Sequence, residues 1–141
     1  MEILSPVHGK ITYSEDEVLK FEKAIPGFEE IQKYIIRDID EESSFKILQA
    51  IDNPNICFVI ISPFDVEEEY EIELNDEIIK RLGIEKSEDV ILYSLVTLNS
   101  NPDKITVNLK APIIINILTN KGEQFIVDKE KYKIKHPLMK G

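Results

Sequence analysis

The residues with the chemistry to act as nucleophiles or metal ligands are few and far apart in the sequence. The chain has one cysteine, Cys57, and two histidines, His8 and His136. Cys57 lies in the apolar run 56–60, and a thiol buried in apolar surroundings is inert. A zinc site needs about four cysteine or histidine ligands, which these residues do not supply without carboxylates. We therefore expect no catalytic residue, no metal site and no cofactor.

Two further patterns that bind ions are incomplete. A loop that cradles phosphate needs closely spaced glycines, but the five glycines of this chain are widely separated. Asp38, Asp40 and Glu42 have the spacing that opens a calcium loop, yet the glycine that must follow is missing. We interpret these three residues as an exposed acidic turn between two strands.

Charge is unevenly distributed along the 141 residues, whose formal net charge is -10. Residues 47–79 contain nine acidic residues and no Lys, Arg or His, whereas residues 129–141 contain five lysines and one glutamate. Such an acidic field repels nucleic acid and attracts basic surfaces. The same excess of acidic residues is also typical of an ordinary solvated surface that keeps a protein in solution.

The apolar residues form short segments of strand length between turn signals. We predict strands at 34–39, 45–51, 57–61, 70–74, 90–98, 105–109, 113–115 and 125–127. One short helix is predicted at 76–83, capped by Asn75 and ended by Gly83. The predicted fold class is mainly all-β, a single compact antiparallel β-barrel-like domain over residues 1–141. Pro112 cannot donate to a ladder, so a bulge or edge is expected there.

The two ends of the chain also carry predictions. The first ten residues lack the apolar run of a signal peptide, and no apolar stretch is long enough to span a bilayer. We expect a cytoplasmic protein without membrane contact. Lysines alternate with other residues over 129–136, which predicts an edge strand protected by lysine or, alternatively, a minor phosphate-binding stripe.

Several phrases of the sequence resemble the FliW family of flagellar assembly factors. They are the run 21–29 with Pro-Gly-Phe-Glu, Phe45-x-x-Leu48-Gln49, Asn-Leu-x-Ala-Pro-Ile at 108–113, and the His-Pro-Leu ending. The family-motif residues, which we interpret mainly as structural, are Pro26, Gly27, Phe28, Gln49, Asn108, Ala111, Pro112, Asn116, His136 and Pro137. Pro26 and Gly27 read as the centre of a tight turn, and Asn108 and Asn116 as partners of backbone groups.

The resemblance implies a non-enzymatic regulator that binds flagellin and CsrA in the cytoplasm. CsrA is a dimeric RNA-binding repressor of flagellin translation, and FliW freed by flagellin export captures it. Since CsrA must be basic to hold RNA, we place the expected partner-binding residues in an acidic run, namely Glu67, Glu68, Glu69, Tyr70 and Glu71.

Two other classes of function stay open. One is an enzyme or small-molecule binder that uses the barrel mouth, which requires a pocket with converging polar groups. The other is an RNA-binding module that uses the lysine-rich stretch, and the acidic remainder of the chain opposes it.

Overall fold

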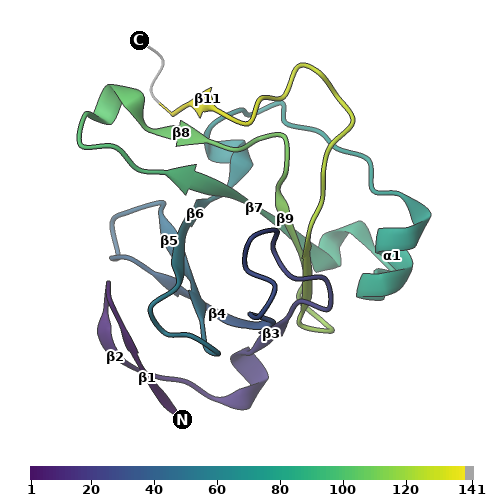
Figure 1. The fold of residues 1–141 in the computed structure, drawn as a ribbon. Coiled ribbons are helices and arrows are strands. Elements are labelled where there is room, and N and C mark those ends of the chain that lie inside the picture. The colour runs from purple at the N-terminus through teal and green to yellow at the C-terminus, as the bar shows by residue number, and fades with distance from the viewer. Residues whose placement is uncertain (139–141) are drawn as a thin grey trace.

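Seven strands close into a barrel in the computed structural model, which describes residues 1–138 (Figure 1). The ring closes because β7 pairs with β6 on one side and with β9 on the other. Its strands are β3 (Leu19–Lys20), β4 (Lys33–Asp38), β5 (Lys46–Ala50), β6 (Cys57–Ile61), β7 (Val90–Thr97), β9 (Ile113–Asn116) and β10 (Lys121–Gln124). The predicted fold class, a mainly β barrel with one short helix, is confirmed.

The pairing departs from the prediction at one place in the ring. Every pair of neighbouring strands is antiparallel except β3 and β10, which run parallel and meet at Lys20 and Lys121. This parallel pairing joins residues about a hundred positions apart in the sequence, so no local sequence pattern predicts it.

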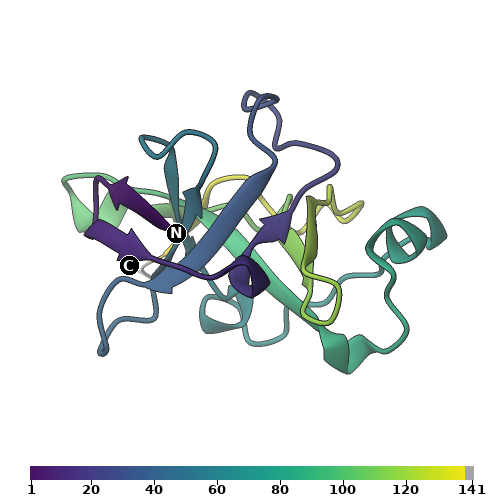
Figure 2. The same cartoon turned by 90° about the horizontal axis from the view of Figure 1, so that it is seen from below.

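The remaining elements lie outside the ring. A hairpin of β1 (Glu2–Ser5) and β2 (Gly9–Thr12) lies on one side and α1 (Asp76–Leu82) on the other, as Figures 1 and 2 both show. The short strands β8 (Thr106–Val107) and β11 (His136–Pro137) extend the sheet from the end of β7. Short 3-10 turns are η1 (Glu15–Glu17), η2 (Pro63–Asp65), η3 (Ser87–Asp89) and η4 (Pro102–Lys104).

The core divides between the inside of the barrel and its outer face. Alternate residues of a strand point to opposite faces, so Tyr34 of β4 packs inside with Phe21 while Ile35 packs outside with Ile11 of the hairpin. Further outer clusters lie under α1 and under the loop that follows η2. Because both faces are covered there, Ile47 to Ala50 of β5 are all buried.

The helix forms where the sequence predicts it. The Asn75 side chain accepts a hydrogen bond from the Ile78 backbone N–H at 2.9 Å, which satisfies a free donor of the first turn. Gly83 ends the helix in the left-handed conformation, with φ of 66°. Ile78 and Leu82 are buried against Ile114 of β9, so packing stabilises this seven-residue helix. Among the described residues, no helix has the length and hydrophobicity that a membrane span requires.

The predicted strand at 70–74 is absent. The segment keeps the alternation of a strand, with Tyr70 buried, Ile72 and Leu74 half-buried, and Glu71 and Glu73 exposed. It is part of no ladder; packing of Tyr70 and Ile72 in the cluster under the loop and hydrogen bonds of the Glu71 backbone to the Tyr132 and Lys129 side chains hold it instead. The alternation of apolar and acidic residues predicted correctly which side chains are buried, but it predicted a strand where the structure has none.

Two predictions near the C-terminus are also wrong in their bounds. The ladder after the turn comprises β10 (Lys121–Gln124) rather than 125–127, because Asn120, with φ of 57°, completes the turn and Gly122 enters the strand. Residues 129–135 form no strand; within 129–136 only His136 pairs, opposite Val107. The edge that we predicted to be protected by lysine is therefore two residues long, His136 and Pro137.

Tyr34 gives a testable feature of the core. Its hydroxyl is buried and has no hydrogen-bond partner among the described residues. Burial, with a smaller effect of the Asp52 carboxylate, raises the pKa of Tyr34 from 10.0 to about 12. Because Tyr34 holds its hydroxyl proton more tightly in the folded than in the unfolded protein, this protonation difference contributes to the free energy of unfolding. The contribution is complete below pH 10 and is lost as the pH rises through about 12.

We expect Tyr34→Phe to stabilise the protein by about 1 kcal/mol at neutral pH, because it removes an unpaired buried hydroxyl. The loss of stability above pH 10 should be smaller in the variant than in the parent protein. Denaturant unfolding between neutral and alkaline pH measures both effects, with Tyr13→Phe as the control. An identical alkaline loss in the parent and in Tyr34→Phe would contradict the assignment.

Candidate protein-binding surface

The acidic run predicted to bind a partner lies in the loop between η2 and α1. Glu68, Glu69 and Glu71 are exposed and Glu67 is partly exposed. None of these four carboxylates belongs to a salt bridge with another described residue. Their charge is therefore available to an approaching molecule.

Contacts to the C-terminal part of the chain hold this loop in place. The Tyr70 hydroxyl donates to the Leu109 carbonyl at 2.7 Å, and its ring lies 4.5 Å from the Tyr132 ring, centroid to centroid. The Glu71 backbone N–H donates to the Tyr132 hydroxyl at 2.7 Å, and the Lys129 ammonium donates to the Glu71 carbonyl at 3.1 Å. The acidic side chains thus project from a fixed backbone.

Tyr70 does not lie where we expected it. It is 4% exposed, so it anchors the loop from below and cannot present its side chain to a partner in this conformation. The sequence could not distinguish the two roles, because a buried anchor and an exposed aromatic contact have the same residue type.

Tyr70→Phe should destabilise the protein by about 1–2 kcal/mol, because the buried Leu109 carbonyl loses its donor. Hydrogen exchange should speed up most at residues 67–73. Tyr13→Phe, which alters a half-buried tyrosine under the other side of the barrel, is the control. Exchange that changes equally over the whole molecule would contradict an anchoring role.

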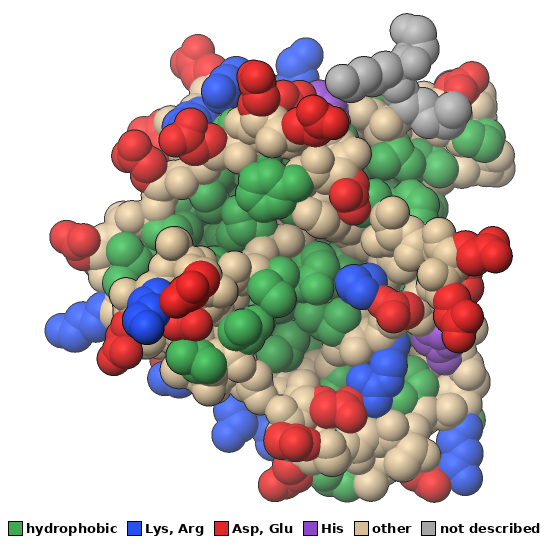
Figure 3. Space-filling model, turned by 180° about the vertical axis from the view of Figure 1, so that it is seen from behind, with side chains coloured by type: hydrophobic (Ala, Val, Ile, Leu, Met, Phe, Trp, Pro, Cys, Tyr) green, Lys and Arg blue, Asp and Glu red, His purple; other side chains and the backbone are tan. Residues whose placement is uncertain are grey.

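An apolar groove opens beside the acidic loop. It has a volume of about 670 Å³ and lies between the loop, α1 and the start of β7. Its apolar walls and floor are Phe64, Ile72, Leu74, Ile79, Ile84, Val90, Ile91 and Leu92, and Glu85, Lys86 and Ser87 add polar groups. Figure 3 shows a face that is hollowed, with hydrophobic side chains in the hollows and many charged side chains around them.

The segment that builds this groove holds most of the net charge of the protein. Residues 62–92 contain eleven acidic and three basic residues, a balance of -8 in a chain whose total is -10. Of these acidic residues only Glu85 lines the groove itself, and Glu67 and Glu69 of the acidic run line a second, smaller hollow. We call the whole segment, residues 62–92, the acidic groove region.

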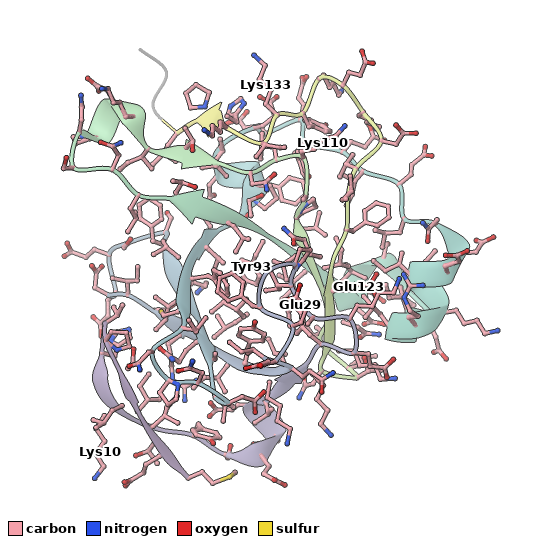
Figure 4. The ribbon with its side chains drawn as sticks, viewed as in Figure 1. Lys10, Glu29, Tyr93, Lys110, Glu123 and Lys133 are labelled. Atoms are coloured by element: carbon pink, nitrogen blue, oxygen red, sulfur yellow. The ribbon has the colours of Figure 1, made fainter. Side chains whose placement is uncertain are left out.

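The α1 wall of the acidic groove region is fixed by an ion pair whose carboxylate is buried. Arg81 donates to both oxygens of Glu123, at 2.8 and 2.7 Å, and the Glu123 side chain is 8% exposed. This bidentate bond holds the Arg81 pKa above its ordinary value. Figure 4 shows Glu123 on the side of the barrel that faces α1, so the pair ties the helix to β10.

The residues of the Pro-Gly-Phe-Glu phrase build a turn at the other side of the molecule. The Phe28 N–H donates to the Ile25 carbonyl at 2.8 Å across Pro26 and Gly27, and Gly27 has φ of 90°. Proline at the first central position and a positive φ at the second define a type II turn. Phe28 packs edge-to-face on Phe58, with ring centroids 4.9 Å apart.

Gln49 fixes the neighbouring turn from β5. Its amide nitrogen lies within hydrogen-bond distance of three carbonyls, those of Ala50, Pro54 and Ile56. Because Gln49 is fully buried, its side chain supplies hydrogen bonds to carbonyl groups of the turn at 51–56 that would otherwise lack a partner.

Three of the family-motif residues lie in the crossing from β8 to β9, and a fourth, Asn116, ends β9. The Asn108 side chain accepts from the N–H groups of Lys110 and Ala111, and the Ala111 carbonyl accepts from Gln124 at 3.1 Å. Pro112 precedes β9 directly and its carbonyl accepts from Phe125. Asn116 is 1% exposed, donates to the Leu82 carbonyl at 2.8 Å, and so ties the end of α1 to β9.

His136 and Pro137 lie in β11, where they pair with β8. His136 is half-buried and lines a small hollow of about 230 Å³ together with Glu67, Glu69 and Lys131. The lysines of the stretch 129–135 do not share one face of a strand; Lys133 points away from the barrel at its upper end in Figure 4. The structure thus removes the geometry on which a phosphate stripe depends.

Two spaces smaller than the groove of the acidic groove region lie against the barrel core. One of about 560 Å³ beside Phe28 and Ile56 also has Glu29 and Asp52 in its lining. The other, at the mouth of the barrel beside Tyr93, has a volume of about 230 Å³ and is mainly apolar; the ion pair of Arg37 with Glu17 lies at its side. Tyr93 extends into the barrel there (Figure 4). Pockets for small molecules usually measure about 300–1,000 Å³ and contain converging polar groups.

The other residues considered for catalysis or metal binding, the acidic run at 38–42 and Cys57, lie in surroundings that give them structural roles. The Asp40 carboxylate accepts from the N–H groups of Glu42 and Ser43, which makes a local turn of the acidic run at 38–42. Cys57 is half-buried rather than fully buried, and burial raises the pKa of its thiol, which disfavours the reactive thiolate. Within residues 1–138, no three His, Cys, Asp or Glu side chains gather as metal ligands would.

Sequence reasoning missed the groove itself. Phe64, Ile84 and Ile91 come from three separate segments, and Phe64 is 46% and Ile91 38% exposed. The sequence shows apolar residues such as Phe64 and Ile84 within an acidic stretch, but apolar residues that stand singly on a surface are common and do not predict a groove.

Comparisons with known proteins agree with the resemblance in the sequence. The profile of the family described as "FliW protein" matches residues 2–138. The flagellar assembly factor FliW of Clostridium botulinum (strain Okra / Type B1) is 46% identical over 140 residues, which cover 99% of this chain and 98% of that protein. The one of Clostridium beijerinckii is 45% identical over 139 residues, 99% of each chain.

A solved structure agrees over the whole fold. A crystal structure of the flagellar assembly factor FliW superimposes with a TM-score of 0.93 at 37% identity and covers 100% of this chain and 99% of that one. The family profile, the curated relatives and the fold all point the same way, and the chain belongs to the FliW family.

Proposed function

We propose that this chain is a cytoplasmic flagellar assembly factor without enzymatic activity, which acts by binding proteins. Its proposed partners are flagellin, for which it serves as a chaperone, and the translational regulator CsrA. Flagellin and CsrA compete for the chain, so export of flagellin frees it to capture CsrA and relieve repression of flagellin translation. Support comes from membership of the FliW family and from the names of the relatives.

The observation that carries the CsrA part is the charge of the acidic groove region. A protein that binds RNA must present positive charge, and a surface with a balance of -8 over residues 62–92 complements it. The exposed carboxylates of Glu67 to Glu71 increase the rate of encounter with a basic partner and repel RNA beside it. No contact with nucleic acid or membrane is part of the proposal.

A competition pull-down tests this function directly. The purified chain should retain flagellin and CsrA separately, and added flagellin should displace CsrA. A gel shift at modest salt should show that the chain alone does not shift RNA, whereas it reduces the shift caused by CsrA. Failure to retain either protein would reject the proposal, and a shift of RNA by the chain alone would favour the RNA-binding alternative.

A further inference from the structure

We infer that the groove of the acidic groove region binds one amphipathic helix of a protein partner, with the apolar face of the helix in the groove and basic residues along its flanks. This inference deepens the proposed function, because it assumes that the partner is a protein and names the feature that the groove recognises. It concerns the groove walls and does not depend on which partner supplies the helix.

The shape of the groove favours side-chain anchors over strand pairing. Its floor is the outer face of β7, where Leu92 packs with the α1 cluster while the next residue, Tyr93, packs inside the barrel. A ligand that lies on a sheet face meets side chains and no free ladder, so backbone pairing contributes little. A helix that presents residues i, i+3, i+4 and i+7 fits such a trough.

The apolar lining shows what face the ligand must have. The walls come from Phe64 and Ile72 of the loop and from Ile79 and Ile84 of the helix side. Phe64 is 46% exposed although it lies against Tyr70, with ring centroids 6.0 Å apart. Water contact with these side chains is unfavourable, and covering them with apolar groups drives association.

Charge complementarity sets the flanks of the ligand. Glu85 lines the groove, and the exposed acids Asp65, Glu71, Glu73 and Glu88 each stand next to a groove-lining residue in the sequence. Lys86 is the single basic residue that lines the groove. A helix with lysine or arginine beside its apolar stripe is therefore favoured over one with acidic flanks.

The walls are also held firmly enough to act as a preformed site. Tyr70 and Tyr132 fix the loop wall, and the Arg81–Glu123 pair fixes the helix wall. A preformed groove loses little conformational freedom on binding, so a helix of moderate length can bind it measurably.

A synthetic helix tests the inference apart from any natural partner. The probe is a fluorescein-labelled peptide of about 18 residues with leucines on one face and lysines on both flanks, long enough to reach helical conformations. Its controls are a scrambled sequence and a version with glutamate in place of lysine. We expect the basic helix to bind at least about tenfold more tightly than either control in fluorescence anisotropy.

Groove variants and matched surface variants locate the binding. Phe64→Ala and Ile84→Asn should weaken binding of the probe at least about tenfold. Leu118→Ala and Ile126→Asn change equally exposed or more exposed apolar residues outside the groove and should leave it unchanged. Phe64→Leu keeps an apolar side chain and should retain most of the affinity. If Ile84→Asn unfolds the protein, Phe64→Ala decides the outcome.

Charge variants give effects of opposite sign. Glu85→Lys should weaken binding of the basic helix and Lys86→Glu should strengthen it, whereas Glu41→Lys at a remote exposed site should have no effect. In nuclear magnetic resonance titrations, shifts should concentrate in residues 62–92. Shifts centred elsewhere, or equal binding of the basic and acidic helices, would overturn the inference.

The proposed function and the groove inference can fail separately. If CsrA and flagellin are retained but Phe64→Ala affects neither them nor the probe, the groove inference is rejected while the proposed function stands. If the probe binds the groove but neither protein is retained, the proposed function is rejected and the groove inference stands.

Discussion

Replacing Gly122 by alanine should cost about 3 kcal/mol of folding free energy, at the upper end of what one added methyl group costs in a packed core. A Cβ at this position would lie 2.6 Å from Cε1 and 2.7 Å from Cζ of Phe21. Phe21 is fully buried and packs on Tyr34, with ring centroids 5.0 Å apart, so its ring has no free space to enter. Urea denaturation measures the loss.

A second substitution separates steric overlap from other causes. Phe21→Leu removes the ring atoms in the way, so the double variant should be more stable than the sum of the two single losses predicts. Gly83→Ala is the matched control: its Cβ would lie 3.4 Å from Thr119 and its φ is 66°, so it should cost about 1 kcal/mol through the backbone alone. Phe21→Leu should not rescue Gly83→Ala. Additive losses for Gly122→Ala and Phe21→Leu would contradict the overlap.

Reversing Glu67, Glu68 and Glu69 to lysine should lower the affinity for CsrA about 100-fold at low salt, because three attractive charges become repulsive ones. Calorimetry at several salt concentrations should also show a weaker salt dependence than in the parent protein. The loop should keep its position, because Tyr70 and Tyr132 anchor it from the buried side.

A control with the same change in net charge shows whether position matters. Glu15, Glu41 and Glu42 are exposed and lie outside the acidic groove region, and none of them belongs to a salt bridge with a described residue. Their reversal should change the affinity only slightly. Unchanged affinity and salt dependence in the first variant would remove Glu67 to Glu69 from the binding surface, and equal losses in both would assign the effect to net charge.

Local patterns predicted the elements whose determinants are local. Asn75 and Gly83 set the two ends of α1 because capping depends on a few neighbouring backbone groups. The turn at Pro26 and Gly27 follows from the torsions of those two residues. Most barrel strands follow from short apolar runs between turns, since each run must bury at least one face.

The failures occur where distant residues decide the structure. The segment 70–74 has the period of a strand, but it is held by hydrogen bonds with Leu109 and Tyr132, which lie about 40 and 60 positions further along the chain. The N-terminal hairpin was missed, although Pro6 and Gly9 bracket its turn. Lysines at 129–135 alternate in sequence, yet this stretch turns before it reaches β8.

The surface for partners was predictable in charge but not in shape. Composition alone located an acidic stretch, and its exposure follows from the cost of burying carboxylates. The groove beside it needs three segments that meet only after folding, namely the loop after η2, α1 and β7. Exposure of Phe64 and burial of Tyr70, six residues apart, could not have been distinguished from residue type.

The parallel contact of β3 with β10 has a consequence during synthesis on the ribosome. Until Lys121 has been made, β3 has no neighbour on one side, and β9 lacks its partner β10. A nascent or prematurely terminated chain therefore exposes two open strands, which can pair with those of other copies. The ring can close only after β10 has been made, so chains cut short before residue 121 should accumulate as aggregates rather than as a loosened monomer.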